Sequence, residues 1–123
     1  TIGHALESVA AESKTPLDHG FAVGVGMIVS LHWSAHRADE AFNKSELRDA
    51  SDQLKKWLIN EDNGDPWRWS TSQNPSELWP FMRKDKKNTS NAVLDIQLIG
   101  IGEANWDCPL EKLDFEMVWD AAF

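Results

Sequence analysis

The stretch GFAVGVGMIVSLHWSAH, residues 20–36, decides the fold class, because it has features of both a helix and a strand. Its three glycines would together cost a helix about 2 to 3 kcal/mol relative to alanine. The apolar side chains in and around it still recur near the helical period, at Leu17, Phe21, Val25, Ile28 and Ala35. As a strand, the stretch would alternate smaller residues with Val23, Val25, Met27 and Val29.

A helix start just before this stretch favours the helix. Thr15 can cap the first turn, Pro16 fits the first helical position, and Asp18 suits the helix dipole. No turn-forming cluster interrupts the run before Asn43. We therefore predict a helix over residues 16–40, in which a glycine can let a neighbouring helix approach closely.

Other segments also have the apolar spacing or the start signals of helices. They predict three further helices, at about residues 2–13, 44–60 and 75–83. Asn43 and Glu46 form a capping-box pattern ahead of the second of these helices, and Asn74 and Glu77 form another ahead of the third. The 44–60 helix is the best supported, because acids come early in it and lysines come late.

Two C-terminal segments alternate apolar and polar residues, which is typical of half-buried strands. They predict strands at about residues 92–101 and 114–121, and the basic stretch RKDKKNTSN, residues 83–91, is expected to be a solvated loop. Strands after a run of helices indicate an α+β fold, with N-terminal helices packed on a small C-terminal antiparallel sheet. The length fits a single domain covering residues 1–123.

The charge of the chain is acidic and unevenly spread. The formal net charge is -8, and residues 103–123 alone hold six acids against one base. Such a surface repels the phosphates of nucleic acids, whose binding needs Lys and Arg. Direct binding of DNA or RNA is therefore disfavoured, and a partner protein with a basic surface is the electrostatic complement.

The cysteine count and the hydropathy pattern indicate where the protein works. Cys108 is the only cysteine, so no internal disulfide can form. The first residues lack the pattern of a secretory signal, and the longest mostly apolar run falls short of the roughly 20 residues of a membrane span. We expect a cytoplasmic protein that does not bind membranes.

Two histidines four residues apart form a candidate metal site. On a helix, His32, His36 and Glu40 would share one face. A tetrahedral ion would need a fourth donor, which could come from His4 or His19. The residue after His32 is a tryptophan, however, so the glutamate that activates water in the H-E-x-x-H arrangement is missing. The metal site is therefore the weaker interpretation.

Catalytic and cofactor motifs are not recognisable in the sequence. Cys108 lies between Asp107 and Glu111, whose charges would raise a thiol pKa and reduce its reactivity. The sequence contains no G-x-S-x-G elbow and no P-loop lysine, and its glycine pairs do not complete a dinucleotide-binding loop. We expect no cofactor and no enzymatic activity.

A surface for a partner protein is the preferred functional site. Trp67, Arg68 and Trp69 combine residue types that are enriched at interface hot spots. Four acidic side chains are assigned to the same function, Glu103, Asp107, Glu111 and Asp114. Rows of acids can imitate a phosphate backbone or steer association with a basic protein.

These observations together predict a small, acidic, non-catalytic protein that binds and inhibits or neutralises a partner protein. Bacterial immunity proteins and phage-encoded antagonists share this profile of small size, acidity and missing catalytic motifs. Two alternatives stay open. One is a metal-binding protein or metal-dependent hydrolase that uses His32 and His36, and the other is a structural subunit of a larger assembly.

Overall fold

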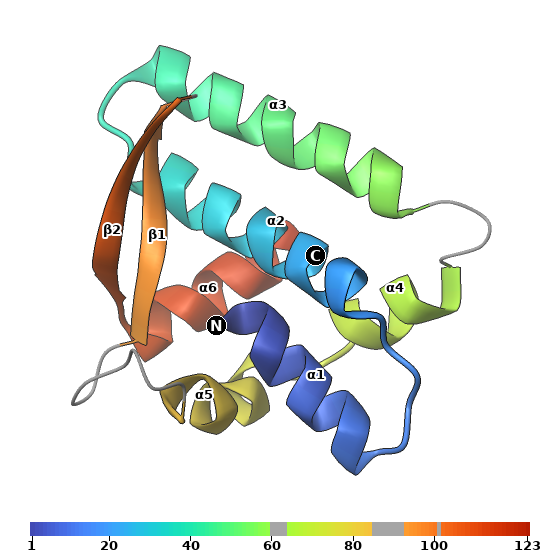
Figure 1. Ribbon diagram of the computed structural model, residues 1–123. Coiled ribbons are helices and arrows are strands. Elements are labelled where there is room, and N and C mark those ends of the chain that lie inside the picture. The colour runs from blue at the N-terminus through green and yellow to red at the C-terminus, as the bar shows by residue number, and fades with distance from the viewer. Residues whose placement is uncertain (60–63, 85–92, 101) are drawn as a thin grey trace.

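The computed structural model describes residues 1–59, 64–84, 93–100 and 102–123. These residues form six helices and one antiparallel strand pair (Figure 1), in the order α1 (Ile2–Glu12), α2 (His19–Arg37), α3 (Ala41–Leu58), α4 (Gly64–Thr71), α5 (Pro75–Arg83), β1 (Val93–Gly100), β2 (Glu103–Leu110) and α6 (Lys112–Ala122). The predicted α+β class is confirmed. The strand pair lies between α5 and α6 in the chain, so the last described element is a helix.

Helix α2 contains the whole ambiguous stretch and lies at the centre of the fold (Figure 1), where it contacts α1, α3, α6 and β1. It begins at His19 instead of Pro16, because Asp18 still has extended backbone and takes the N-cap position. It ends at Arg37 instead of residue 40, because Ala38 is extended as well. The predicted helix is therefore confirmed with both ends shortened.

Close approach of neighbouring helices explains the glycines of α2. A Cβ atom on Gly26 would lie 3.1 Å from the backbone nitrogen of Gly3 in α1, and a Cβ on Gly3 would lie 3.1 Å from the carbonyl oxygen of Ala22. A Cβ on Gly24 would lie 2.9 Å from Leu58 Cδ1, at the end of α3. The glycines lower the intrinsic helix propensity, and this cost is offset by the burial of α2 against α1 and α3.

The two predicted capping boxes have different outcomes. Helix α5 begins as expected, because the Asn74 side chain accepts hydrogen bonds from the Ser76 backbone N–H at 3.0 Å and from the Ser76 hydroxyl at 2.8 Å. Helix α3 begins earlier than predicted, at Ala41, with Glu40 as its N-cap. The box at Asn43 is therefore wrong, and Asn43 lies inside the helix.

Helix α4 was not predicted, because Asp65 and Pro66 look like turn residues in the sequence. Both fit the first turn of a helix equally well, since an acid suits the dipole and proline tolerates the early positions. Packing favours the helix over the turn, because the half-buried Trp67 and Trp69 lie against the main core.

The C-terminal strand prediction is wrong in its second half. Residues 114–121 belong to helix α6, whose buried residues follow the helical period: Phe115, Val118, Trp119 and Ala122. Met117, which an alternating strand would bury beside Phe115, is 44% exposed. The partner of β1 is instead β2, which was missed because Asn105, Asp107 and Pro109 are poor strand formers and nearly the whole strand is exposed. The β1 prediction is confirmed; residues 92 and 101 lie outside the described residues, as do residues 85–91 of the expected loop.

Two serines of α2 hold strand β1 against the helix. The Ser30 hydroxyl donates to Asp95 Oδ2 at 2.7 Å, and the Ser34 hydroxyl accepts from the Leu98 backbone N–H at 2.9 Å. Ser34 also donates to the carbonyl oxygen of Ser30 at 2.7 Å, so its hydroxyl links the two elements. These bonds place Asp95 beside the middle of α2.

None of the helices in the described ranges is both long enough and apolar enough to cross a membrane.

Candidate metal centre

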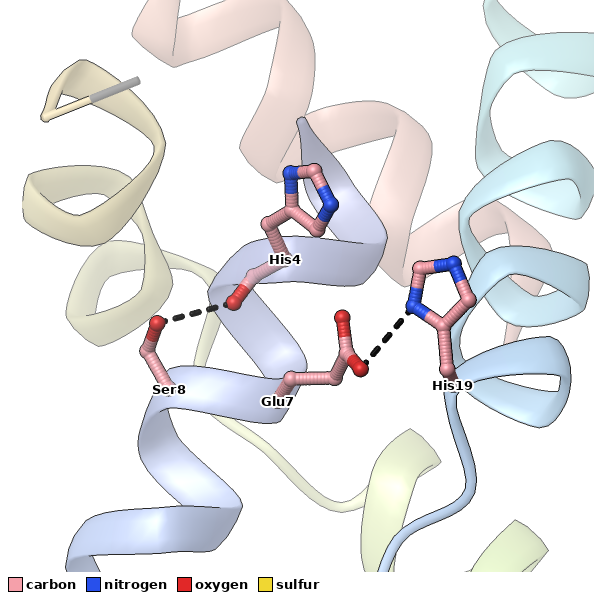
Figure 2. A network of polar contacts seen from close by, with 4 residues as sticks. All are labelled: His4, Glu7, Ser8 and His19. Atoms are coloured by element: carbon pink, nitrogen blue, oxygen red, sulfur yellow. Dashed lines mark hydrogen bonds and ion pairs between the residues drawn. The ribbon is translucent and has the colours of Figure 1, made fainter. Parts of the chain in front are cut away.

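Three side chains that can bind a metal ion meet where α1 passes the start of α2 (Figure 2). His4 and Glu7 are three residues apart on α1 and therefore share a face of the helix, and His19 is the first residue of α2. The Nδ1 atom of His19 lies 3.0 Å from Oε1 of Glu7. The rings of His4 and His19 are stacked, with centroids 5.9 Å apart and an angle of 26° between their planes.

The close helix contact described above creates this cluster. His4 directly follows Gly3, whose bare backbone lies against Ala22, one turn after His19. One potential ligand atom from each of His4, Glu7 and His19 lies within 4.8 Å of the other two. The Ser8 hydroxyl donates to the His4 carbonyl oxygen at 2.9 Å within α1 (Figure 2). The cluster is accessible, since the side chain of His19 is 64% exposed and that of Glu7 is 29% exposed.

A pocket of about 470 Å³ adjoins the cluster and includes both histidines in its lining. Its wall combines the N-terminal end of α1, one face of α2 and the β1 strand, with apolar side chains such as Val23, Met27 and Ile96. Asp95, held by Ser30, contributes a carboxylate to the same wall. The lining of the pocket therefore combines two imidazoles, a carboxylate and a mostly apolar surface.

The donor set suits a zinc-like divalent ion. Neutral imidazole nitrogen and carboxylate oxygen are the common ligands of catalytic zinc, which keeps a fourth position for water or substrate. If His19 donates its Nδ1–H to Glu7, its Nε2 lone pair is available to a metal, and the carboxylate fixes the ring in that tautomer. The geometry therefore fits either direct ligation by Glu7 or orientation of His19 by Glu7.

The predicted pair His32 and His36 lies near the other end of α2. Both residues line a smaller pocket of about 140 Å³, whose third polar lining residue is Arg48. Glu40 is not part of that pocket and instead lines a hollow with Arg37 and Asp39. Within the described ranges, the group of donors close enough to hold a metal contains none of these three predicted residues.

The prediction from the sequence includes His4 and His19 only as possible extra ligands for a site at His32. It does not include Glu7. The available signal was the spacing of His4 and Glu7, which puts an imidazole and a carboxylate on one helix face. The pairing with His19 depends on how α1 and α2 pack, and no local pattern in the sequence reports that contact.

His32 gives a prediction for the pH dependence of stability. Burial, together with the positive charges of Lys55 and Arg48, holds the pKa of His32 below its ordinary value of 6.5, although Asp52 acts in the opposite direction. Below about pH 6.5 the unfolded chain therefore binds a proton at His32 more readily than the folded chain does. The free energy of unfolding should decrease as the pH is lowered through this range. Urea unfolding measured from pH 5 to 8 tests this. The free energy of unfolding should decrease less toward acid pH in a His32→Gln variant than in the native protein. An unchanged dependence of the free energy of unfolding on pH in His32→Gln would show that His32 is not the group responsible.

The predicted partner-binding residues lie in two separate regions. Trp67 and Trp69 are half-buried against the core, and Arg68 is exposed with Asp65 at 3.7 Å. Glu103 and Asp107 are exposed on β2, and Glu111 and Asp114 lie at the start of α6. Figure 1 shows α4 and the strand pair on opposite sides of the molecule, so these residues do not form one continuous surface. Binding of a partner protein by either region stays a prediction.

Comparison with known proteins identifies the family. A family model described as 3-dehydroquinate synthase C-terminal matches residues 1–88. The 3-dehydroquinate synthase of Symbiobacterium thermophilum is 31% identical over 103 residues, which cover 84% of this chain and 26% of that protein. The enzymes of the same name from Xanthomonas campestris pv. campestris strain 8004 and Xanthomonas axonopodis pv. citri strain 306 are each 33% identical over 107 residues, covering 85% of this chain and 27% of theirs. No solved structure matches the chain significantly.

These findings overturn the functional prediction made from the sequence. A non-catalytic inhibitor or immunity protein is wrong, and so is the expectation that the chain has no enzymatic role, because the relatives are named as enzymes and the matching model describes part of that enzyme. The chain spans about a quarter of the length of the curated relatives it matches. It belongs to the family of 3-dehydroquinate synthase C-terminal domains.

Proposed function

We propose that this chain acts as the C-terminal part of a 3-dehydroquinate synthase and that His4, Glu7 and His19 form a centre for a divalent metal ion in its active site. The observation that carries the metal centre is the 3.0 Å contact between His19 Nδ1 and Glu7 Oε1, beside the stacked His4 ring. The activity is supported by the family match and by the names of the relatives.

His19 is the ligand best prepared by its surroundings. When neutral His19 donates its Nδ1–H to Glu7, the Nε2 atom of the ring carries the lone pair that a metal needs. The ring of His4 stacks on that of His19 at an angle of 26° and brings a second imidazole to the same place. The two histidines lie on different helices, His4 on α1 and His19 on α2. The site therefore depends on the contact between α1 and α2 and is lost if these helices separate.

The pocket beside the cluster is mostly apolar, and its polar groups include the two histidines and Asp95. An ion bound there would supply Lewis-acid chemistry toward a substrate oxygen. Asp95, which is held by the hydrogen bond from Ser30 and lines the same pocket, can accept a hydrogen bond from a substrate hydroxyl. A substrate seated against the apolar lining would displace water from the pocket and so strengthen these polar interactions.

Zinc binding by this chain tests the metal centre. Isothermal titration with Zn²⁺ should show one site, and Glu7→Gln should weaken its affinity by about 10- to 100-fold, since the amide neither ligates well nor fixes His19 as a carboxylate does. His19→Ala should remove the site. The matched control is Glu12→Gln, which removes the same charge from an exposed position on the same helix.

Two results would contradict the metal centre. One is equal zinc affinity in the native chain and the His19→Ala variant. The other is an equal loss of zinc affinity in Glu7→Gln and Glu12→Gln, which would mean that only the net charge of the helix matters. A His36→Ala variant separates the two pairs of histidines, because it should leave the high-affinity site intact.

The proposed activity is tested separately in a chimera. In the Symbiobacterium thermophilum enzyme, the aligned segment is replaced by this chain, and the formation of 3-dehydroquinate is measured. The chimera should be active, and the same chimera with His19→Ala should lose most of its activity while keeping its circular dichroism spectrum. A chimera that folds and binds zinc without forming product would contradict the activity and leave the metal centre standing.

We also propose a cytoplasmic location and a partner protein with a basic surface. The cytoplasmic location is consistent with a single free thiol at Cys108. A basic partner protein is consistent with the net charge of -8.

A further inference from the structure

A second pocket lies between α2, α3 and α6, away from the metal centre. It has a volume of about 140 Å³ and shares no lining residue with the larger pocket. His32 and His36 of α2 and Arg48 of α3 form its polar side, and α6 contributes Met117, Val118 and Ala121. Pockets for drug-sized ligands run from about 300 to 1,000 Å³, so this one suits a small ion.

All the polar groups that line this pocket carry nitrogen donors. No carboxylate is among its lining residues, although the chain as a whole has a net charge of -8. In the part of the chain that the structure describes, no ion pair is formed by Arg48. The Arg48 guanidinium supplies the positive charge of this hollow, and the two imidazoles add ring nitrogens that can donate hydrogen bonds.

One residue that lines the pocket has a buried polar atom without a partner. His32 Nε2 is buried and has no hydrogen bond among the described residues. In the tautomer that carries the proton on Nε2, this N–H lacks an acceptor, and an anion that accepts from it would recover the free energy lost by leaving it unsatisfied. The charged groups that act on His32 come from α3, namely Arg48, Lys55 and Asp52, and the α6 residues of the pocket carry no charge.

We propose that this pocket binds a small, doubly charged tetrahedral oxyanion through His32, His36 and Arg48. The guanidinium can donate two parallel hydrogen bonds to two oxygens of such an anion, and the imidazole N–H groups can donate to the others. The bound anion would also favour the protonated form of His32, because opposite charge stabilises an imidazolium. This site is independent of the proposed metal centre.

Inorganic phosphate is the probe for this site. The imidazole carbon and proton signals of the chain are followed by NMR in EDTA, with sodium chloride keeping the ionic strength constant. His32 and His36 should shift along saturating curves with a dissociation constant on the order of 1 mM, and the pKa of His32 should rise. His4 and His19 should show no saturable change.

Matched variants on α3 test the role of Arg48. Arg48→Gln should weaken phosphate binding about tenfold or more, since a charge-assisted hydrogen bond is lost. Lys56→Gln removes one positive charge from an exposed position of the same helix outside the pocket and should leave the affinity nearly unchanged. If Arg48→Gln does not fold, the exposed His36→Gln takes its place and should weaken binding too.

Three outcomes would overturn the proposal. The first is a linear, non-saturating drift of the four histidines together. The second is an equal loss of affinity in Arg48→Gln and Lys56→Gln, which would mean general screening. The third is acetate binding as tightly as phosphate, because a planar anion with one charge should not satisfy the three donors equally well.

Discussion

Replacing Phe115 by alanine should lower the free energy of unfolding by about 3 to 5 kcal/mol. Phe115 is fully buried at 0% exposure, and its ring centroid lies 5.9 Å from that of Trp79 and 5.8 Å from that of Trp119. Removing the ring leaves a cavity among large aromatic side chains that cannot collapse easily to fill it. Urea or thermal unfolding of the purified variant measures the effect.

Met117→Ala is the control for this prediction, and it also distinguishes the two interpretations of the segment. A strand would place Phe115 and Met117 on one buried side, so both substitutions would be costly. In helix α6 Met117 is 44% exposed, and its replacement should cost less than about 1 kcal/mol. Comparable losses in the two variants would contradict the helix.

Gly3→Val should destabilise the protein by about 3 kcal/mol, at the upper end of the range for overpacking. A Cβ at this position would lie 3.1 Å from the Ala22 carbonyl oxygen and 3.2 Å from Val23 Cα. These are backbone atoms, so they cannot rotate away as a side chain could, and α1 has to move off α2. The same movement would separate His4 from His19, so zinc affinity should fall together with stability.

Gly20→Val provides a matched control in α2. A Cβ on Gly20 would meet nothing within 4 Å, so the substitution should change the free energy of unfolding by less than about 0.5 kcal/mol. The difference between the variants isolates the helix contact from the general effect of replacing glycine. Equal effects would show that the close approach of α1 and α2 does not matter for stability.

The helix starts and ends illustrate what local sequence can decide. The Asn74 cap was predicted correctly because its partner, the Ser76 backbone N–H, is only two residues away. The Asn43 box failed because the helix begins earlier, at Ala41, although Glu40 at the N-cap position makes no side-chain capping hydrogen bond. Local rules therefore predicted that these helices exist and were weaker on where they begin.

The candidate metal centre was only partly visible in the sequence. His4 and His19 attracted attention as donors, yet they were assigned to a site that the fold keeps at the other end of α2. The 3.0 Å contact between His19 and Glu7 joins residues that are twelve positions apart and lie on two helices. Such a contact depends on the angle and spacing of those helices, which sequence spacing does not contain.

By itself, the sequence determined that the stretch 20–36 can be helical, that α5 is capped by Asn74, and that residues 93–100 form a strand, because apolar periodicity and turn chemistry are local properties. The tertiary structure alone decided that α2 becomes the central helix, that residues 114–121 are helical, and that His4, Glu7 and His19 meet. The physical reason is that burial and close packing act between segments distant in the chain. They outweigh local propensities that differ by less than about 1 kcal/mol per residue.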